Sequence, residues 1–557
     1  MAVQKFKPIN IRNSYLPGDP NAFLENLEYS RAEDDPETPI PILPFEGYNF
    51  LPTEYGYRSY FGTNSVLDVY PLTSRCDRII TFRGVDGTNR MIALCEDGIW
   101  TCNPSIAGTS WVQIVIYTYV STTHRKWTVV ILNSSVYCYQ LNRPTINKFD
   151  SAFTWTAYAP SFLTMAGQEG IFQAGGRLGI WDSLNSVAWS SVFDYTDFIP
   201  SLETLAGNTK FLGIQGKIVT IVKHGVGFII YCTEGVVSIR PNSQMSGSIW
   251  EGVPVSNIAG IRHPTEVDVG SSDVEHYVYS TLGLVSISAY NAISRTHAID
   301  LAMTEVTDFL RETDGEIALK IINGRYLFLC LIDPLYLNGL VSAVTTATSP
   351  LETPVLWDDS TNVLTNASEI MYWTGATPVP STAFTLAISA PDSIYPTYAG
   401  ALVYDLALKK WGKMLGDFKQ LQSITPENST DIAITSYTDL GMNAGILLAN
   451  GYTKLFDNLP LNSMLRWGKI GLSRSYNTTL LTARMDFRSA STGTLQVNSS
   501  LDGRTLHPLY ERSTNFNNSL QCIHTSSYNA AWHTIAVTGR WDLQFMEFGG
   551  IVSGNRP

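Results

Sequence analysis

Short apolar runs separated by tight polar turns recur along most of this chain. An apolar strand, a turn built on Gly, Asn or Ser, and a second apolar strand follow one another around Gly98, Ser135, Gly235, Gly283, Gly324 and Gly451. Gly supplies the positive φ that tight hairpin turns require, and the flanking Val, Ile, Leu, Tyr and Trp suit a half-buried pleated strand. Each copy therefore predicts a β-hairpin.

The spacing of the hairpins predicts the fold. Successive turns lie roughly 40 to 50 residues apart, which is the length of a four-stranded propeller blade. Where a repeat is hard to recognise, the spacing is about two to three times that length. From about Leu67 to Leu459 helical periodicity is almost absent, except in Asp300–Thr313, where apolar residues recur at helical spacing. We predict an all-β protein with a β-propeller of about six blades.

Composition divides the chain into three parts. Residues 1–65 are rich in Pro and are predicted to form an extended arm, because Pro at this density excludes helix and central strand. Residues 66–461 are predicted to form the propeller, with a Thr-, Ser-, Ala- and Pro-rich insertion near 340–400. Residues 462–557 show period-2 strands and predict a small β-sandwich-like domain, or alternatively strands that complete the ring.

The arm carries more apolar side chains than a solvated linker does. Phe23, Leu27 and Ile42 are examples. We expect the arm to become ordered against a partner, and the alternative is a flexible tail.

The charge balance indicates which partners to expect. Only 15% of the residues are charged, against roughly 25% in ordinary soluble domains. A surface so poor in charge favours a protein that is largely covered by neighbours in an assembly. The net charge of −12 argues against tight binding to nucleic acid, because that affinity comes from Lys and Arg neutralising phosphates.

Cysteine usage and the N-terminus bear on location. The seven cysteines contain no CxxC pair, and several lie inside apolar strands, so we predict buried free thiols and assembly in a reducing cytoplasm. The first residues lack the apolar core of a secretory signal, and no run of 18 apolar residues occurs. We expect a soluble chain with no leader and no contact with a membrane.

Candidate catalytic groups do not form a recognisable motif. A nucleophile elbow, a P-loop, a dinucleotide-binding fingerprint and an HExxH pair are all absent from the sequence, so no catalytic residue, cofactor or metal is predicted. Neighbouring carboxylates could serve hydrolysis or metal binding, but we interpret them as solvated polar residues. These are Asp194 with Asp197, Asp358 with Asp359, and Asp273 with Glu275 and His276.

Two further motifs are interpreted as structural. Trp-Asp dipeptides at Trp181, Trp357 and Trp541 do not follow the blade spacing, which argues against a WD40 array. Ser500–Gly503 is similar to the Asp-box turn of sialidase propellers, but it occurs once and outside the repeats, so it predicts a hairpin turn.

One segment is distinctive. Gly175–Ser201 contains an Arg-led strand, a hairpin, a Trp-Ser strand and a loop in which Asp194 and Asp197 precede Phe198. This order resembles a phrase common in tail proteins of tailed bacteriophages. Asn13–Pro17 (NSYLP) and Tyr55–Thr63 (YGYRSYFGT) resemble early motifs of the nozzle proteins of short-tailed phages, also called packaged-DNA stabilisation or tail tubular proteins.

The end of the chain agrees with the same family. Ser500–Gly503 and Gly539–Phe545 are similar to the Asp-Gly turn and the final Gly-Arg strand of its closing domain. The turn in YFGT lacks the Pro expected for the family, and the 340–400 insertion also departs from the pattern. Both differences concern segments where partners are expected.

The resemblance implies a function. It implies a non-enzymatic virion structural protein of the phage tail, assembled in the host cytoplasm as a homo-oligomeric ring of six copies. The ring would lie below the portal and its adaptor, the head-to-tail connector, contact tail fibre or spike proteins, and extend and block the DNA channel until genome ejection. Contact with genomic DNA would be transient and non-specific, and we expect an acidic channel wall to repel phosphates.

Two alternatives belong to other classes. One is a propeller glycosidase or depolymerase that acts on host polysaccharide, and the other is a receptor-binding or fibre-docking tail module. The sequence identifies no partner-binding residue. We expect partners at the arm, the insertion and the closing domain, because the hairpin repeats look like scaffold.

Overall fold

The structure is a computed structural model. It describes residues 7–9, 44–54, 56–59, 64–65, 70–71, 76–103, 111–118, 126–161, 163, 167–242, 249–255, 260–269, 274–280, 283–288, 296–298, 306, 310, 315–322, 324–332, 365–366, 369–374, 377–380, 400–408, 410–414, 420–424, 433–437, 443–448, 463–470, 476–487, 491–500, 507–516, 521–524, 529–530 and 532–555.

Five antiparallel four-stranded sheets follow one another from residue 76 to residue 298, each a simple meander. Blade one is β7 (Cys76–Arg83), β8 (Asn89–Cys95), β9 (Gly98–Cys102) and β10 (Val112–Ile116). Blade two is β11 (Trp127–Leu132), β12 (Ser135–Gln140), β13 (Ile146–Phe149) and β14 (Trp155–Tyr158). Blade three is β15 (Gln168–Ala174), β16 (Arg177–Asp182), β17 (Val187–Trp189) and β18 (Gly207–Thr209). Blade four is β19 (Ile218–His224), β20 (Gly227–Cys232), β21 (Val236–Pro241) and β22 (Trp250–Pro254), and blade five is β23 (Val267–Val269), β24 (Glu275–Ser280), β25 (Gly283–Ser288) and β26 (Thr296–Ala298).

Two more blades close the ring. Blade six is β27 (Glu316–Ile322), β28 (Tyr326–Ile332), β32 (Gly400–Asp405) and β33 (Lys410–Met414). Blade seven is β34 (Gln420–Ile424), β35 (Ala433–Tyr437) and β36 (Asn443–Leu448). The first strand of each blade lies innermost, and β34 contacts both β27 and β7, so the seventh blade joins the sixth to the first.

The outer strand of blade seven comes from the other end of the propeller. β36 pairs antiparallel with β5 (Asn64–Ser65) and β6 (Tyr70–Pro71), which precede blade one in the chain. The ring is therefore closed by backbone hydrogen bonds between its first and last segments. The two-residue strands β5 and β6 then form the outer edge of this blade in place of the longer β36.

The predicted all-β propeller is confirmed, and the described strands make seven blades where about six were expected. The six hairpin phrases omitted blade three, whose first turn is Gly175–Gly176, with φ values of 52° and 70°. The turn of blade two follows the expected chemistry, because Asn133 and Ser134 adopt φ values of 47° and 55°. Gly451 lies outside the described residues.

The single expected helix is represented by two residues. Val306 and Leu310 are helical, and Val306 is fully buried in the core of blades five and six. The remainder of Asp300–Thr313 lies outside the described residues.

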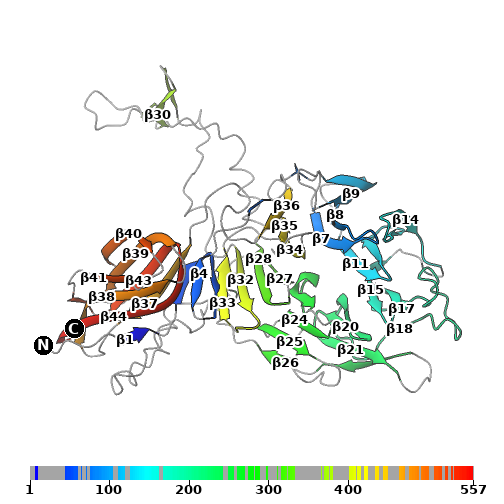
Figure 1. Cartoon of the computed structure of the whole chain (residues 1–557). Coiled ribbons are helices and arrows are strands. Elements are labelled where there is room, and N and C mark those ends of the chain that lie inside the picture. The colour runs from blue at the N-terminus through cyan, green and yellow to red at the C-terminus, as the bar shows by residue number, and fades with distance from the viewer. Residues whose placement is uncertain are drawn as a thin grey trace.

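The chain ends in two sheets beside the propeller (Figure 1). Their strands are β37 (Met464–Ile470), β38 (Tyr476–Phe487), β39 (Ser491–Ser500), β40 (His507–Phe516), β41 (Gln521–His524), β42 (Asn529–Ala530), β43 (Trp532–Arg540) and β44 (Asp542–Asn555). One sheet has the order β2 (Pro44–Tyr48), β37, β43, β39 and β40, and the other contains β44, β38 and β41, with β1 (Lys7–Ile9) on β44 and β42 on β38. The C-terminal strands do not complete the ring, since β5 and β6 do so.

A hairpin joins the propeller to these sheets. β3 (Phe50–Pro52) pairs with β33 of blade six, and β4 (Tyr57–Ser59) pairs with β44, so one sheet runs from the propeller into the C-terminal part. Figure 1 shows β4 between β33 and the C-terminal strands. Phe50 and Tyr57 are fully buried in a core that includes Trp411 of blade six and Leu543 of β44.

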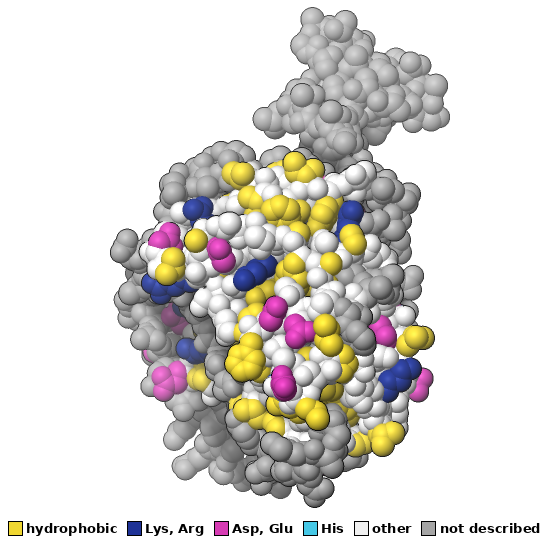
Figure 2. Space-filling model, turned by 90° about the vertical axis from the view of Figure 1, so that its right-hand side faces the viewer, with side chains coloured by type: hydrophobic (Ala, Val, Ile, Leu, Met, Phe, Trp, Pro, Cys, Tyr) yellow, Lys and Arg dark blue, Asp and Glu magenta, His cyan; other side chains and the backbone are white. Residues whose placement is uncertain are grey.

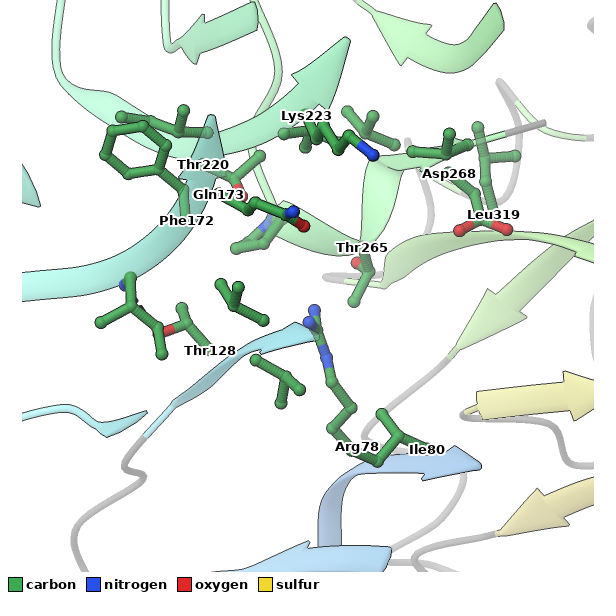
Figure 3. Close-up of a pocket in the computed structure, with 18 of the residues that line it drawn as sticks. Arg78, Ile80, Thr128, Phe172, Gln173, Thr220, Lys223, Thr265, Asp268 and Leu319 are labelled. Carbon is green, nitrogen blue, oxygen red and sulfur yellow. Dashed lines mark hydrogen bonds between the residues drawn. The ribbon is translucent and has the colours of Figure 1, made fainter. Parts of the chain in front are cut away.

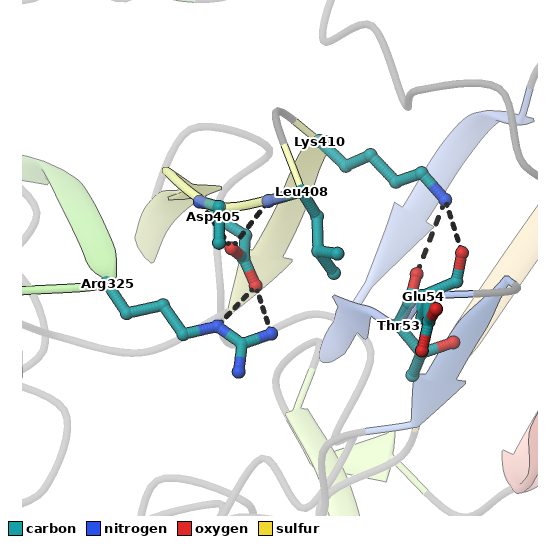
Figure 4. A network of polar contacts seen from close by, with 7 residues as sticks. Thr53, Glu54, Arg325, Asp405, Leu408 and Lys410 are labelled. Atoms are coloured by element: carbon teal, nitrogen blue, oxygen red, sulfur yellow. Dashed lines mark hydrogen bonds and ion pairs between the residues drawn. The ribbon is translucent and has the colours of Figure 1, made fainter.

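An ion pair within blade six and a lysine that reaches the β3–β4 turn lie next to this junction (Figure 4). The buried Asp405 carboxylate accepts hydrogen bonds from Arg325 Nε at 2.9 Å and Nη2 at 2.7 Å, while its other oxygen accepts two backbone N–H groups of the following turn. Lys410 Nζ donates to the carbonyl oxygens of Thr53 at 3.3 Å and Glu54 at 3.5 Å. Blade six is thereby attached to the β3–β4 turn.

Part of the segment predicted as an extended arm is paired strand. Residues 44–48, 50–52, 57–59 and 64–65 belong to three different sheets of this same chain. Pro44 and Pro52 occupy the ends of β2 and β3, where a missing N–H is tolerated. Residues 10–43, including the NSYLP motif, lie outside the described residues.

The predicted insertion contributes a small sheet of its own. β29 (Thr365–Asn366), β30 (Glu369–Thr374) and β31 (Thr377–Pro380) pair only with one another among the described strands. Figure 1 shows β30 away from the propeller. The other residues of 340–400, apart from Gly400 in β32, lie outside the described part of the chain.

The close approach of β3 to β33 requires Gly412. A Cβ at this position would lie 2.6 Å from Phe50 O and 3.0 Å from Pro52 Cδ, and backbone cannot give way as a flexible side chain can. We expect Gly412→Ala to lower the free energy of unfolding by about 1–3 kcal/mol, measured by urea denaturation. The control is Gly235→Ala, whose Cβ would first meet the flexible end of Gln215 at 3.1 Å. Equal destabilisation by both variants would contradict this account of the junction.

Candidate functional site

The Gly175–Ser201 segment forms the scaffold of blade three. Arg177, which begins β16, is buried, and its Nη1 donates to Ser190 O at 2.8 Å and Thr204 O at 3.0 Å. Burial lowers the pKa of Arg177 below its usual value. The guanidinium therefore holds the loop after β17 against β16 and is not exposed to a ligand.

The Asp pair of this segment shapes turns. Asp194 Oδ1 accepts hydrogen bonds from Thr196 N at 2.8 Å and Thr196 Oγ1 at 2.7 Å, and Asp197 Oδ1 accepts one from Ile199 N at 2.9 Å. Both carboxylates satisfy local backbone, as Asp side chains commonly do in loops. Their positions give no support to a hydrolytic pair.

In the group of Asp273, Glu275 and His276, the histidine is buried and hydrogen-bonded. Its Nδ1 lies 2.8 Å from Tyr231 OH and its Nε2 lies 2.8 Å from Lys223 O. A carbonyl can only accept, so Nε2 carries the proton and Nδ1 accepts from the tyrosine. Glu275 instead accepts a hydrogen bond from Tyr277 OH at 2.8 Å. Asp273 lies outside the described residues.

The other candidate motifs are structural where they are described. Trp181 and Trp541 are buried, and Asp182 Oδ1 accepts the backbone N–H groups of Leu184 and Ser186 in the hairpin turn. Trp357, Asp358, Asp359, Asp502 and Gly503 lie outside the described residues. In the part of the chain that is described, no three His, Cys, Asp or Glu side chains are grouped to hold a metal ion.

Six cysteines are buried and unpaired. Burial raises the pKa of Cys102 to about 12 and that of Cys232 to about 11. At neutral pH these thiols are protonated and fill space in the blades as small apolar groups. The side chain of Cys522 lies outside the described part of the chain.

Side chains connect neighbouring blades near the axis. Separate sheets share no backbone ladder, so polar side chains of the inner strands bond to the next blade instead. Asp77 Oδ2 accepts from Trp127 N at 2.8 Å, Thr128 Oγ1 accepts from Ile171 N at 3.0 Å, Thr265 Oγ1 donates to Ile317 O at 2.9 Å, and Asp268 Oδ2 accepts from Ile321 N at 2.6 Å. We call these contacts the inter-blade bonds.

A cavity of about 310 Å³ lies at the centre of the ring (Figure 3). Its walls are β7, β11, β15, β19, β23, β27 and the 3-10 turn η1 (Pro264–Glu266). Most lining side chains are aliphatic, with polar groups at Arg78, Thr128, Gln173, Thr220 and Lys223 among others. No local motif in the sequence predicts this cavity, although a single Arg or Lys within an otherwise apolar strand, as at Arg78 and Lys223, is a visible signal.

Exposed apolar side chains gather in blade three. Seven of the thirteen exposed large hydrophobic residues among those described fall within residues 184–212. The three most exposed of these are Leu202 at 93%, Leu212 at 89% and Phe193 at 88%. Figure 2 faces the side where β14, β17 and β18 lie in Figure 1, and it shows hydrophobic side chains with acidic and basic ones among them.

Comparison with known proteins adds nothing beyond the fold. No protein-family model matches the chain, and no curated protein matches it. A streptogramin B lyase structure is 9% identical, with 68% of this chain and 97% of that chain covered and a TM-score of 0.33. A structure of the mitotic checkpoint complex is 8% identical (70% and 96% covered, TM-score 0.40), and YCF48 bound to a D1 peptide is 10% identical (71% and 97% covered, TM-score 0.32). Among the described residues, no helix is long and apolar enough to cross a membrane.

The environment of His224 predicts that the free energy of unfolding depends on pH. Its Nε2 hydrogen-bonds Val274 O at 3.0 Å and its ring packs on His276, and burial lowers its pKa below the usual 6.5. On lowering the pH, the unfolded chain therefore takes up a proton before the folded chain does. The contribution of His224 is complete above about pH 6.5 and is lost as the pH falls below that value.

The measurement is the free energy of unfolding in urea at pH 8 and at pH 5.5. We expect the wild type to lose more stability between these values than His224→Gln, because Gln does not titrate. Equal losses in the two proteins would show that His224 does not carry the effect.

Proposed function

We propose that this chain is a non-enzymatic structural protein of a bacteriophage tail. In this proposal it is a nozzle subunit that forms a ring of six copies below the portal and adaptor, contacts tail fibre or spike proteins, and extends and closes the DNA channel until ejection. Its place is the virion tail, and its contact with DNA is transient.

The observation that carries the proposal is the apolar surface of blade three. Phe193 lies in the segment that resembles phage tail proteins, Leu202 follows it directly, and Leu212 follows β18; all three side chains are almost fully exposed. Large apolar side chains that are exposed on a soluble subunit are candidates for burial in a subunit interface. The low charged fraction of 15% supports the same interpretation.

The hydrogen bonds of the candidate catalytic groups also favour a structural role for this chain. Asp182, Asp194 and Asp197 organise turns, and His276 is buried between a tyrosine and a carbonyl. A glycosidase requires two carboxyl groups facing one another across an accessible cleft. Asp182, Asp194 and Asp197 instead accept hydrogen bonds from backbone N–H groups, and Glu275 accepts one from Tyr277 OH.

The proposal predicts that blade three mediates self-association. Replacing Phe193, Leu202 and Leu212 together by Ser removes three large apolar contacts, so the ring should dissociate, with association weakened at least tenfold. Light scattering after size-exclusion chromatography measures the oligomer mass. Val85→Ser, at a 79% exposed position in the first turn of blade one, is the matched control and should leave the ring intact.

Two results would contradict the proposal. If the triple variant keeps the mass of the wild-type ring, blade three is not the subunit interface. If the wild type is a monomer that does not co-sediment with adaptor-bearing capsids, the nozzle function itself is wrong. Release of oligosaccharides from host polysaccharide by the purified chain would instead favour the depolymerase alternative.

A further inference from the structure

Two buried cysteines lie directly opposite each other in blade one. Cys76 begins β7, Cys95 ends β8, and the antiparallel register pairs the two residues. Opposite residues of an antiparallel pair project their side chains onto the same face of the sheet, and their Cα atoms lie about 4.5–5.5 Å apart. A disulfide requires a Cα separation of about 4.4–6.8 Å, so the backbone at this pair already has the spacing of a cross-strand disulfide.

The two side chains also contact each other while they are reduced. The thiol of Cys95 is hydrogen-bonded to the side chain of Cys76, and burial together with this hydrogen bond raises the pKa of Cys95 well above its usual value. Cys76 Sγ in turn donates to Arg78 O at 3.5 Å. The two sulfur atoms therefore lie side by side, and a bond between them requires no change in the pairing of the strands.

The other described cysteines have no cysteine opposite them. Their cross-strand partners are Met91 for Cys102, Val129 and Asn147 for Cys138, Ile218 for Cys232, and Ala318 and Ala401 for Cys330. Within the described part of the chain, the strand register therefore brings two cysteines together only at Cys76 and Cys95.

The pair lies at the start of the ring. β7 is the innermost strand of blade one, contacts β34 of blade seven, and follows the closing strands β5 and β6 in the chain. Cys95 O accepts a hydrogen bond from Trp127 Nε1 of blade two at 3.0 Å, and Asp77, next to Cys76, accepts from Trp127 N. A covalent bond at this position would join the first strand of the ring to β8 beside the contact with blade two.

We propose that Cys76 and Cys95 form a redox-sensitive disulfide that joins β7 to β8. The pair is a dithiol in a reducing environment and is oxidised by thiol–disulfide exchange with a small organic disulfide. The site lies within one blade, so it goes beyond the nozzle function and does not depend on it.

The exchange balances with the small disulfide as the only oxidant. The Cys76 thiolate attacks one sulfur of RS–SR, which forms a mixed disulfide and releases one RS⁻. The Cys95 thiolate then attacks Cys76 Sγ, which forms the Cys76–Cys95 bond and releases the second RS⁻. The two protons of the cysteine thiols go to the two leaving thiolates, so the protein loses two electrons and two protons while RS–SR becomes two RSH.

Burial makes this reaction slow in the folded chain. The reagent reaches Cys76 only when the first residues of β7 open locally, as the ends of strands do. The raised pKa of Cys95 leaves little of its thiolate for the second step. Long incubation is therefore part of the test.

Mass spectrometry of the folded full chain tests the proposal. The chain is incubated in mixtures of 2-mercaptoethanol and its disulfide, from fully reducing to fully oxidising, and free thiols are then alkylated. After denaturation, cleavage behind Arg and Glu releases residues 76–78 and residues 91–96, each with one cysteine. We expect these two peptides to be linked in the oxidising mixtures and separate after treatment with dithiothreitol.

Variants and hydrogen exchange locate the bond. Cys95→Ala should abolish the linked peptides, whereas Cys102→Ala, the matched control at another buried cysteine of blade one, should leave them unchanged. Oxidation should slow amide hydrogen exchange in β7 and β8 of the wild type at least tenfold, because the bond opposes local opening of the hairpin. Exchange in Cys95→Ala should not respond to oxidation.

Mixed disulfides at Cys76 or Cys95 without the linked peptides would overturn the proposal. So would the absence of any modification in the most oxidising mixture, or a bond from Cys95 to Cys102 in the folded chain.

Discussion

The architecture depends on the backbone pairing of β36 with β5 and β6. Seven blades packed in sequence form an open arc unless the last blade is joined to the first. Here the strands just before blade one, β5 and β6, pair with the last blade and join the two ends. The preceding hairpin, β3–β4, joins blade six to the C-terminal sheets. Residues 44–71 therefore determine both the closure of the propeller and its attachment to the rest of the molecule.

Polar side chains are distributed according to this architecture. Near the axis, acids such as Asp77 and Asp268 accept hydrogen bonds from the adjacent blade, where a β ladder is impossible. In the outer loops, acids such as Asp194 shape turns. Among the described residues, the wall of the central cavity carries Arg78, Lys223 and Lys320 together with Asp268. Residues 184–212, in and after blade three, carry seven of the thirteen exposed large hydrophobic residues among those described.

The features that depend on short-range sequence patterns could be predicted from the sequence. Apolar alternation and turn residues such as Asn133 predicted the hairpins and the propeller, and burial of Cys102 and Cys232 followed from their apolar strands. The list of hairpin repeats omitted blade three, although its first turn, Gly175–Gly176, has the positive φ values of a tight Gly turn. Arg177 is buried only because the carbonyl oxygens of Ser190 and Thr204 reach it from later in the chain.

Long-range pairing accounts for the other failures. Nothing local in residues 44–65 reveals that they pair with segments near residues 413, 448, 465 and 543, so their Pro content suggested an arm. The central cavity was equally hidden, because lining residues such as Arg78 and Lys223 are 145 residues apart in the sequence and line one cavity only in the folded ring. The acidic wall expected for a DNA channel concerns the axis of the six-copy ring and stays a prediction.

The central claim is that this propeller is a subunit of a tail nozzle, and its location in the assembled particle tests that claim most directly. Electron microscopy of adaptor-bearing capsids mixed with the purified chain would reveal that location. The account predicts additional density as a closed ring, coaxial with the portal and directly below the adaptor. Density at the tail periphery, or none on the capsid, would contradict it.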